Sequence, residues 1–312
     1  MSATDAGLRT GTTGAGRAAI AVIAGAALWG TAGIAQELGA PTAAPPSVAA
    51  VRTVCGGAVL LLVALVTNGR VGLVDTLRRG RGTCLLAAGA MAVFQLGYLG
   101  AVRSVGVAIG VLVAIGSAPA WAGLYDALRG RFPGWRWLFA TVLSVVAAGL
   151  LLVPTGTEDI APLGIGLALV AGLAYATYAV ASKHLLERGV AGIPVMAIAI
   201  FGAGLLLSPA LWFNDLDWLV TPQGALAAAW LALIAIGASY VAFVWGLARL
   251  STPVVTTLTL TEPLVAALLA VVLLSERLTG LPLLGAVLLM VGLVLVSVRP
   301  PTEAAAVPPM RV

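Results

Sequence analysis

The chain is divided into apolar stretches of about 20 residues, separated by short segments rich in proline, glycine and charge. A helix rises about 1.5 Å per residue, so about 20 apolar residues cross the roughly 30 Å hydrocarbon core of a bilayer. Helices also satisfy their own backbone hydrogen bonds in lipid. The pattern predicts an all-α integral membrane protein with ten transmembrane helices. The predicted spans are residues 18–36, 47–67, 83–102, 107–128, 136–153, 163–183, 193–213, 225–248, 254–274 and 281–298.

Composition agrees with a lipid-embedded chain and excludes several classes of function. The sequence is 61% hydrophobic and 9% charged, against about 25% charged residues in a soluble domain. Its net charge of +5 comes from dispersed residues, not from a basic face with interleaved aromatics, so no nucleic-acid partner is expected. A single histidine, His184, and two cysteines in apolar segments, Cys55 and Cys84, predict no metal site and no cofactor.

Basic residues predict the orientation of the chain. If the N-terminus is cytoplasmic, 14 of the 17 Lys and Arg residues fall on the cytoplasmic side, and only Arg52, Arg103 and Arg277 fall on or toward the other. Cytoplasmic loops retain positive charge, so both termini are predicted to be cytoplasmic in a multi-pass protein of the plasma membrane. The first span, which follows Arg9 and Arg17, could also pass for a signal peptide.

An internal repeat argues that the first span belongs to the core instead. Landmarks of one half recur in the other at a nearly constant offset of 143 to 146 residues, which is typical of duplication. Because each copy has five spans, the second copy must enter the bilayer from the opposite face, giving two inverted five-helix repeats. The predicted division is a cytoplasmic tail at 1–17, repeats at 18–155 and 156–299, and a cytoplasmic tail at 300–312. The matched landmarks are Trp29 with Tyr175, Arg103 with Arg249, Pro119 with Pro263, and Gly149 with Gly292.

Several motifs are shared with a known family: Ala-Leu-Trp-Gly at 27–30, Arg52, Pro119, Thr-Glu-Pro-Leu-Val at 261–265, and Ser-Glu-Arg-Leu-Thr at 275–279. With these motifs the chain resembles the drug/metabolite transporter superfamily, in its ten-helix EamA-type branch, and the resemblance covers residues 18–298. It implies a plasma-membrane permease, often an exporter of amino acids or other metabolites. One departure is Arg-Gly-Arg-Phe at 129–132, where the family often has a Gly-Glu-Arg-Leu-like turn.

We therefore expect a secondary active transporter, an exporter of a small metabolite such as an amino acid or drug-like compound, working by alternating access. A channel or passive membrane sensor is the alternative. An intramembrane enzyme is disfavoured because the sequence lacks the H-E-x-x-H and G-x-S-x-G patterns, and no Walker sequence supplies ATP chemistry. The expected partners are the lipid bilayer, a small-molecule substrate and protons as a candidate coupling ion; the sequence does not predict an oligomeric state.

Charged side chains inside the predicted spans are the main candidates for binding or coupling, since burying a charge in the bilayer is costly. Glu262 lies about eight residues, roughly 12 Å, into the ninth span, and Pro263 is expected to kink that helix. Glu262 either couples protons or binds an amine, or it only hydrogen-bonds a neighbouring helix. Arg52 either binds a carboxylate or acid, or snorkels to the headgroups. The remaining candidates are Trp29, Gln95, Tyr98, Ser117, Pro119, Tyr175, Tyr178, Tyr240, Trp245 and Thr259.

Overall fold

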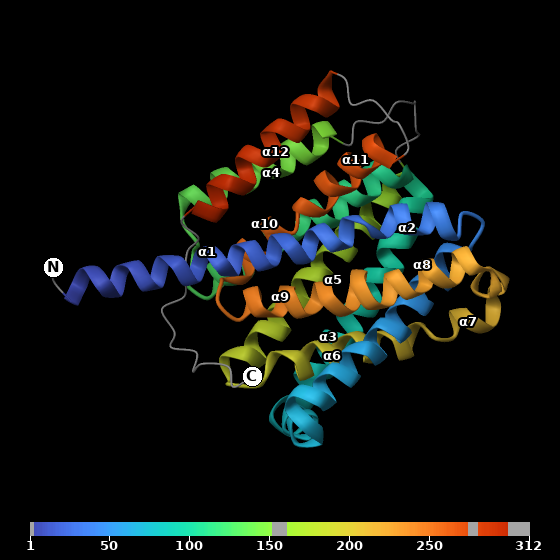
Figure 1. The fold of residues 1–312 in the computed structure, drawn as a ribbon. Helices are drawn as coiled ribbons and strands as arrows, with labels where there is room; N and C mark the ends of the chain where they lie inside the picture. The colour runs from blue at the N-terminus through green and yellow to red at the C-terminus, as the bar shows by residue number, and fades with distance from the viewer. Residues whose placement is uncertain (1–2, 152–160, 274–279, 299–312) are drawn as a thin grey trace.

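The computed structural model describes residues 3–151, 161–273 and 280–298, which form a bundle of helices (Figure 1). Seven helical segments are long and apolar enough to cross a membrane, and two shorter apolar helices accompany them, Trp135–Leu151 and Leu281–Ser297. One of the seven, Pro45–Val105, has 61 residues, about three times the length of one span, and so holds two spans and the segment that joins them. The predicted all-α architecture of ten transmembrane helices is confirmed.

The described helices are bounded as follows. They are α1 (Ala3–Gly30), α2 (Ala32–Gly39), α3 (Pro45–Leu128), α4 (Trp135–Leu151), α5 (Pro162–Glu187), α6 (Gly192–Leu207), α7 (Ala210–Phe213), the 3-10 helix η1 (Asp217–Val220), α8 (Pro222–Ala232), the π-helix η2 (Leu233–Ala238), α9 (Ser239–Leu247), α10 (Thr252–Leu258), α11 (Thr261–Leu273) and α12 (Leu281–Val298).

The long α3 is not a single rod. Gly69 has a φ of +65°, a left-handed conformation that glycine adopts without steric cost, and the chain turns back on itself in this part of α3 (Figure 1). It reverses again near residue 105, where a Cβ on Gly110 would lie 3.0 Å from the backbone nitrogen of Val102. The loop expected at 68–82 is instead helical on both sides of Gly69, and Arg79 pairs with Asp75 at 2.8 Å within that helix.

Helices from the two halves of the chain interleave. The spans of α3 pack mainly against α5 and α6, and α1 lies along α9. The last helix of each half, α4 and α12, pair with each other at the edge of the bundle (Figure 1). Glycines allow these close approaches: a Cβ on Gly25 would lie 2.8 Å from the carbonyl oxygen of Ser239.

The packing has the symmetry of an inverted repeat. The rings of Trp29 and Tyr240 lie 5.1 Å apart, joining α1 to α9. Moving each residue by 146 positions gives Tyr175 and Phe94, whose rings lie 5.3 Å apart and join α5 to α3. The same contact is therefore made twice, once from each repeat.

The ends of the chain differ in part from the prediction. Helix α1 begins at Ala3, within the predicted tail at 1–17, and extends away from the bundle (Figure 1). The Ser-Glu-Arg-Leu-Thr sequence at 275–279, most of the segment between the repeats and the predicted tail at 300–312 lie outside the described residues.

Candidate functional site

The ninth span is broken at the residue expected to carry function. Helix α10 ends at Leu258, and α11 begins at Thr261, so Glu262 lies in the first turn of α11. Pro263 has no N–H to donate to the carbonyl oxygen of Thr259, and the backbone N–H of Glu262 donates to it instead, at 3.0 Å. The predicted kink is present, and it places a carboxylate at a helix N-terminus, where negative charge is favoured.

The first span is broken at the same level. Helix α1 ends at Gly30, and α2 begins after Thr31. A Cβ on Gly30 would lie 2.7 Å from the carbonyl oxygen of Glu262 and 2.9 Å from the Cβ of Val265. Only glycine allows this approach, which sets the neighbouring Trp29 beside the start of α11.

A third irregularity lies in the eighth span. The π-helix η2 separates α8 from α9, and the hydroxyl of Ser239 donates to the carbonyl oxygen of Ala235 at 2.6 Å. Single π-turns inside α-helices often occur at functional sites. Here the extra residue per turn sets the orientation of Tyr240, which follows directly.

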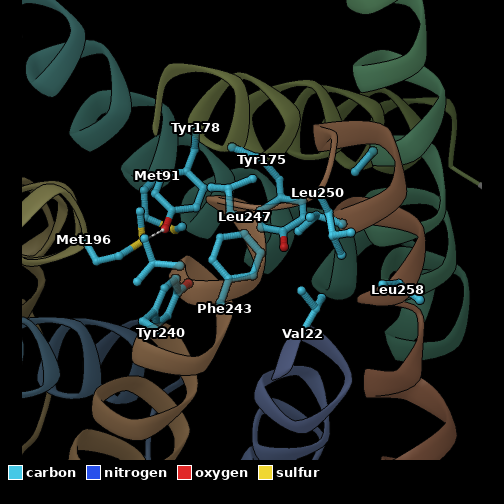
Figure 2. Packing of buried hydrophobic residues seen from close by; sticks show 14 of the residues in the cluster. Val22, Met91, Tyr175, Tyr178, Met196, Tyr240, Phe243, Leu247, Leu250 and Leu258 are labelled. Atoms are coloured by element: carbon cyan, nitrogen blue, oxygen red, sulfur yellow. Dashed lines mark hydrogen bonds between the residues drawn. The ribbon is translucent and has the colours of Figure 1, made fainter. Parts of the chain in front are cut away.

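Aromatic side chains from four spans meet between these irregular segments, and we call them the aromatic cluster. Its centre is Tyr178, whose ring lies 6.3 Å from both Tyr240 and Phe243 and 6.2 Å from Tyr175 (Figure 2). The hydroxyl of Tyr178 donates to the Sδ of Met196 at 2.8 Å. The members are Trp29, Phe94, Tyr98, Tyr175, Tyr178, Tyr240 and Phe243.

Arg52 is directed into the bundle by the side-chain amide of Gln95. Its guanidinium donates to the Oε1 of Gln95 at 2.9 Å, and the Nε2 of Gln95 donates to the hydroxyl of Thr53 at 3.2 Å. Gln95 is 4% exposed, so the guanidinium binds a buried partner. Arg52 lies within electrostatic range of Tyr98, Tyr240 and Glu262.

Glu262 also lies near the aromatic cluster. It is within electrostatic range of the phenol groups of Tyr98, Tyr175 and Tyr240. Within residues 3–151, 161–273 and 280–298, its carboxyl group makes no hydrogen bond or ion pair, and Arg52 acts on it only at longer range. One basic and one acidic side chain thus lie at the cluster without being joined to each other.

Three polar atoms at the cluster are buried without a hydrogen-bond partner among the described residues: the Nε1 of Trp29, the Nε of Arg52 and the hydroxyl of Tyr175. Tyr175 is 5% exposed, and its hydroxyl lies next to Thr259 without a well-oriented hydrogen bond. Leaving such groups unpaired costs about 1–3 kcal/mol each. Their convergence suits a polar ligand.

Four other predicted residues are placed differently. Thr259 donates to the carbonyl oxygen of Thr256 at 2.8 Å, within its own helix. Ser117 lies against Gly172 where α3 meets α5. Pro119 is buried inside α3, and Trp245 lies under the guanidinium of Arg249, 3.9 Å from its ring centroid. No hydrogen bond or ring contact among the described residues joins Ser117, Pro119 or Trp245 to Arg52 or Glu262, whereas Thr259 lies next to the Tyr175 hydroxyl.

Phe94, Phe243 and Thr53 belong to the site but were not expected there. Phe94 had a detectable signal, because it is the residue 146 positions before Tyr240. Phe243 follows Tyr240 by three residues and so shares its helix face. A small surface pocket lies elsewhere, lined by Asp126, Lys183 and His184 among others.

Comparison with known proteins agrees with this arrangement. The EamA-like transporter family matches two segments, residues 16–153 and 162–298. The chain is 34% identical over 284 residues to the uncharacterized transporter YwfM of Bacillus subtilis (strain 168), covering 89% of this chain and 93% of that protein. It shares its fold with a protein of known crystal structure at a TM-score of 0.77 and 21% identity, over 89% of this chain and 95% of the other. The chain therefore belongs to the EamA-like transporter family and is a multi-pass membrane transporter.

Proposed function

We propose that the protein is a secondary active carrier that exports a small zwitterionic metabolite, such as an amino acid, by alternating access. The observation that carries the proposal is the placement of both Arg52 and Glu262 at the aromatic cluster, with no ion pair between them among the described residues. Charges inside a membrane protein are costly and mark binding or ion pathways. Transporter sites also lie where broken helices meet near the middle of the bilayer, as α1 and α11 do here.

The two charges favour a ligand that carries both signs. The guanidinium of Arg52 presents several N–H donors, which suit a carboxylate, and Gln95 orients it. The carboxylate of Glu262 is an acceptor for an ammonium group. Between them, aromatic faces attract cations and apolar groups alike. A neutral ligand would leave both charges uncompensated.

Glu262 is also the candidate for proton coupling. A carboxylate that carries a proton in one state and an ammonium ligand in the other would exchange the two across the membrane. The absence of a direct ion pair with Arg52 among the described residues leaves Glu262 able to release either partner. An inward proton gradient would then drive export.

For the orientation, we propose that both termini are cytoplasmic and that the membrane is the plasma membrane. The two segments at 68–82 and 189–192 must lie at one end of the bundle in this topology. In support, a Cβ on Gly72 would lie 3.6 Å from the side chain of Pro194, and Gly80 packs against Leu185. Arg78, which lies in the first of these segments, is exposed, as the excess of positive charge on the cytoplasmic side requires.

The test is flux through the purified protein in liposomes loaded with a uniformly ¹⁴C-labelled mixture of the standard L-amino acids. Saturable efflux that accelerates when the outside is made acidic supports the proposal. Fast, non-saturating flux would indicate a channel instead, and chemical conversion of the label would indicate an enzyme. No flux of any amino acid would refute the proposed substrate class.

A further inference from the structure

One end of the bundle is closed by a lysine. Lys183, near the end of α5, is 6% exposed, and its Nζ donates to the carbonyl oxygens of Leu247 at 3.1 Å and Leu250 at 3.0 Å. These carbonyls belong to the end of α9 and the turn that follows, where helix C-termini carry partial negative charge. The contact fixes α5 against α9 and α10 at the end proposed to be cytoplasmic.

The internal repeat supplies the equivalent residues at the other end. At the offset of 146, Lys183 corresponds to Glu37, and Leu247 and Leu250 correspond to Ala101 and Ser104. The equivalent contact is not made. Glu37 is exposed, and α2, which carries it, packs mainly against α8 and makes at most sparse contact with α3.

The cause of the difference is the break in the first span. Helix α5 runs without interruption through Ala176 and Thr177, the equivalents of Gly30 and Thr31. In the first repeat the helix breaks at Thr31, and the indole of Trp230 in α8 donates to the Thr31 hydroxyl at 2.8 Å. The outer part of the span is thereby held against α8.

The chemistry of Glu37 selects its partner. Lysine has N–H donors and can bind carbonyl oxygens, whereas a carboxylate only accepts hydrogen bonds and cannot. Arg103 lies between the two equivalent positions, at the end of the third span in α3. It is exposed, and neither Arg103 nor Glu37 makes an ion pair within the described part of the chain.

We propose that Glu37 and Arg103 form the ion pair that closes the outer end of the transporter, as counterparts of the Lys183 contact at the inner end. When α2 straightens at Thr31 onto the axis of α1, Glu37 reaches the end of the third span at 101–104, and the Lys183 contact opens. The two contacts are mutually exclusive. This inference rests on alternating access, as proposed above.

Cysteine cross-linking tests directly whether the outer contact and the Lys183 contact exclude each other. In a chain with Cys55→Ala and Cys84→Ala, the pairs Glu37→Cys with Ser104→Cys and Lys183→Cys with Leu250→Cys are oxidised in liposomes. Each pair should form a disulfide that stops efflux of the labelled amino-acid mixture until a reductant is added. With all four cysteines present, the two disulfides should not form in the same molecule. Failure of the 37–104 pair to cross-link in a chain with normal flux overturns the inference alone, whereas absence of saturable flux in the parent chain refutes the proposed function.

Exchanging the charges of Glu37 and Arg103 tests whether the two side chains form an ion pair or only lie close together. Glu37→Arg and Arg103→Glu should each slow efflux about two- to five-fold, the range of an exposed ion pair, and the double variant should recover to within about two-fold of the parent. Glu37→Arg combined with Arg81→Glu, at the opposite end, should show no recovery. If neither single variant slows efflux, or if the exchange recovers no better than the Arg81 control, then Glu37 and Arg103 do not pair.

Discussion

The hydrogen bond from Arg52 to Gln95 gives the sharpest test of how the site is built. Gln95→Leu keeps a side chain of similar size but removes the Oε1 that the guanidinium contacts at 2.9 Å. A hydrogen bond to a charged group contributes about 1.5–3 kcal/mol, and the freed guanidinium would no longer be held toward the cluster. If that orientation is needed to bind a carboxylate, the KM of efflux should rise by roughly 10- to 150-fold, since each 1.4 kcal/mol is a factor of ten.

Two controls make the result specific. Thr53→Val removes only the neutral bond from Gln95 at 3.2 Å, worth about 0.5–1.5 kcal/mol, and should raise the KM by roughly two- to twelve-fold. Thr67→Val removes a hydroxyl that donates to the carbonyl of Val63 on the exposed surface, and should leave the KM unchanged. The reasoning is refuted if Gln95→Leu folds, as judged by thermal unfolding in detergent, and keeps the parental KM.

Three further predictions address other parts of the site. Glu262→Gln should remove the acceleration of efflux by an acidic exterior while the protein stays folded, and parental rates across pH would exclude proton coupling through this residue. Arg52→Gln should weaken competition by zwitterionic and anionic compounds more than by neutral ones in a flux-inhibition assay; equal loss for all would indicate a structural arginine. Gly30→Val adds a Cβ at 2.7 Å from a backbone oxygen and should destabilise the protein by about 1–3 kcal/mol, read as a lower Tm, whereas Gly33→Val, with open space around it, should not.

The bilayer made the spans predictable, because span length follows from the thickness of the hydrocarbon and needs no tertiary information. The prediction of a loop at 68–82 was wrong, because it was made only from where the apolar stretches end. The arginines of this segment return charge to the chain, as a loop would, but Asp75 and Arg79 satisfy each other one helical turn apart. The return of charged residues indicates where the chain leaves the hydrocarbon core, but the helix can continue beyond that point.

The part of the site that follows from the internal repeat could be predicted from the sequence. The part that depends on how the helices pack could not. The offset that relates Trp29 to Tyr175 also relates Phe94 to Tyr240, so the mirrored ring contacts follow from the sequence. The π-helix at 233–238 does not, because a single extra residue in a helical turn is selected by neighbours such as Gly56, which lies against Ile236. The bond between Arg52 and Gln95 joins two spans and depends on their relative rotation.

A comparison between the repeats explains why the ninth span is broken, a feature that proline alone does not account for. Pro119, the equivalent of Pro263, lies inside α3, which is not broken at that position. In the ninth span two hydroxyls bond within the break: Thr259 donates to the carbonyl of Thr256, and Thr261 to that of Leu258, at 2.8 Å each. At the offset of 144 that relates the two prolines, Ser117 replaces Thr261 and donates to the carbonyl of Ala114 at 3.4 Å, whereas Ile115 replaces Thr259 and has no hydroxyl. The two repeats therefore differ at Thr259.

These hydroxyls satisfy carbonyl oxygens that the break leaves without backbone donors, which would otherwise be costly in a membrane interior. The break in turn places the backbone of Glu262 where Gly30 contacts it. A threonine-lined break in one repeat, facing a glycine break in the other, thus presents one carboxylate to the centre of the bundle. The two repeats share one fold, but their contributions to the site differ. A zwitterionic ligand, with a positive and a negative end, requires such an asymmetric site.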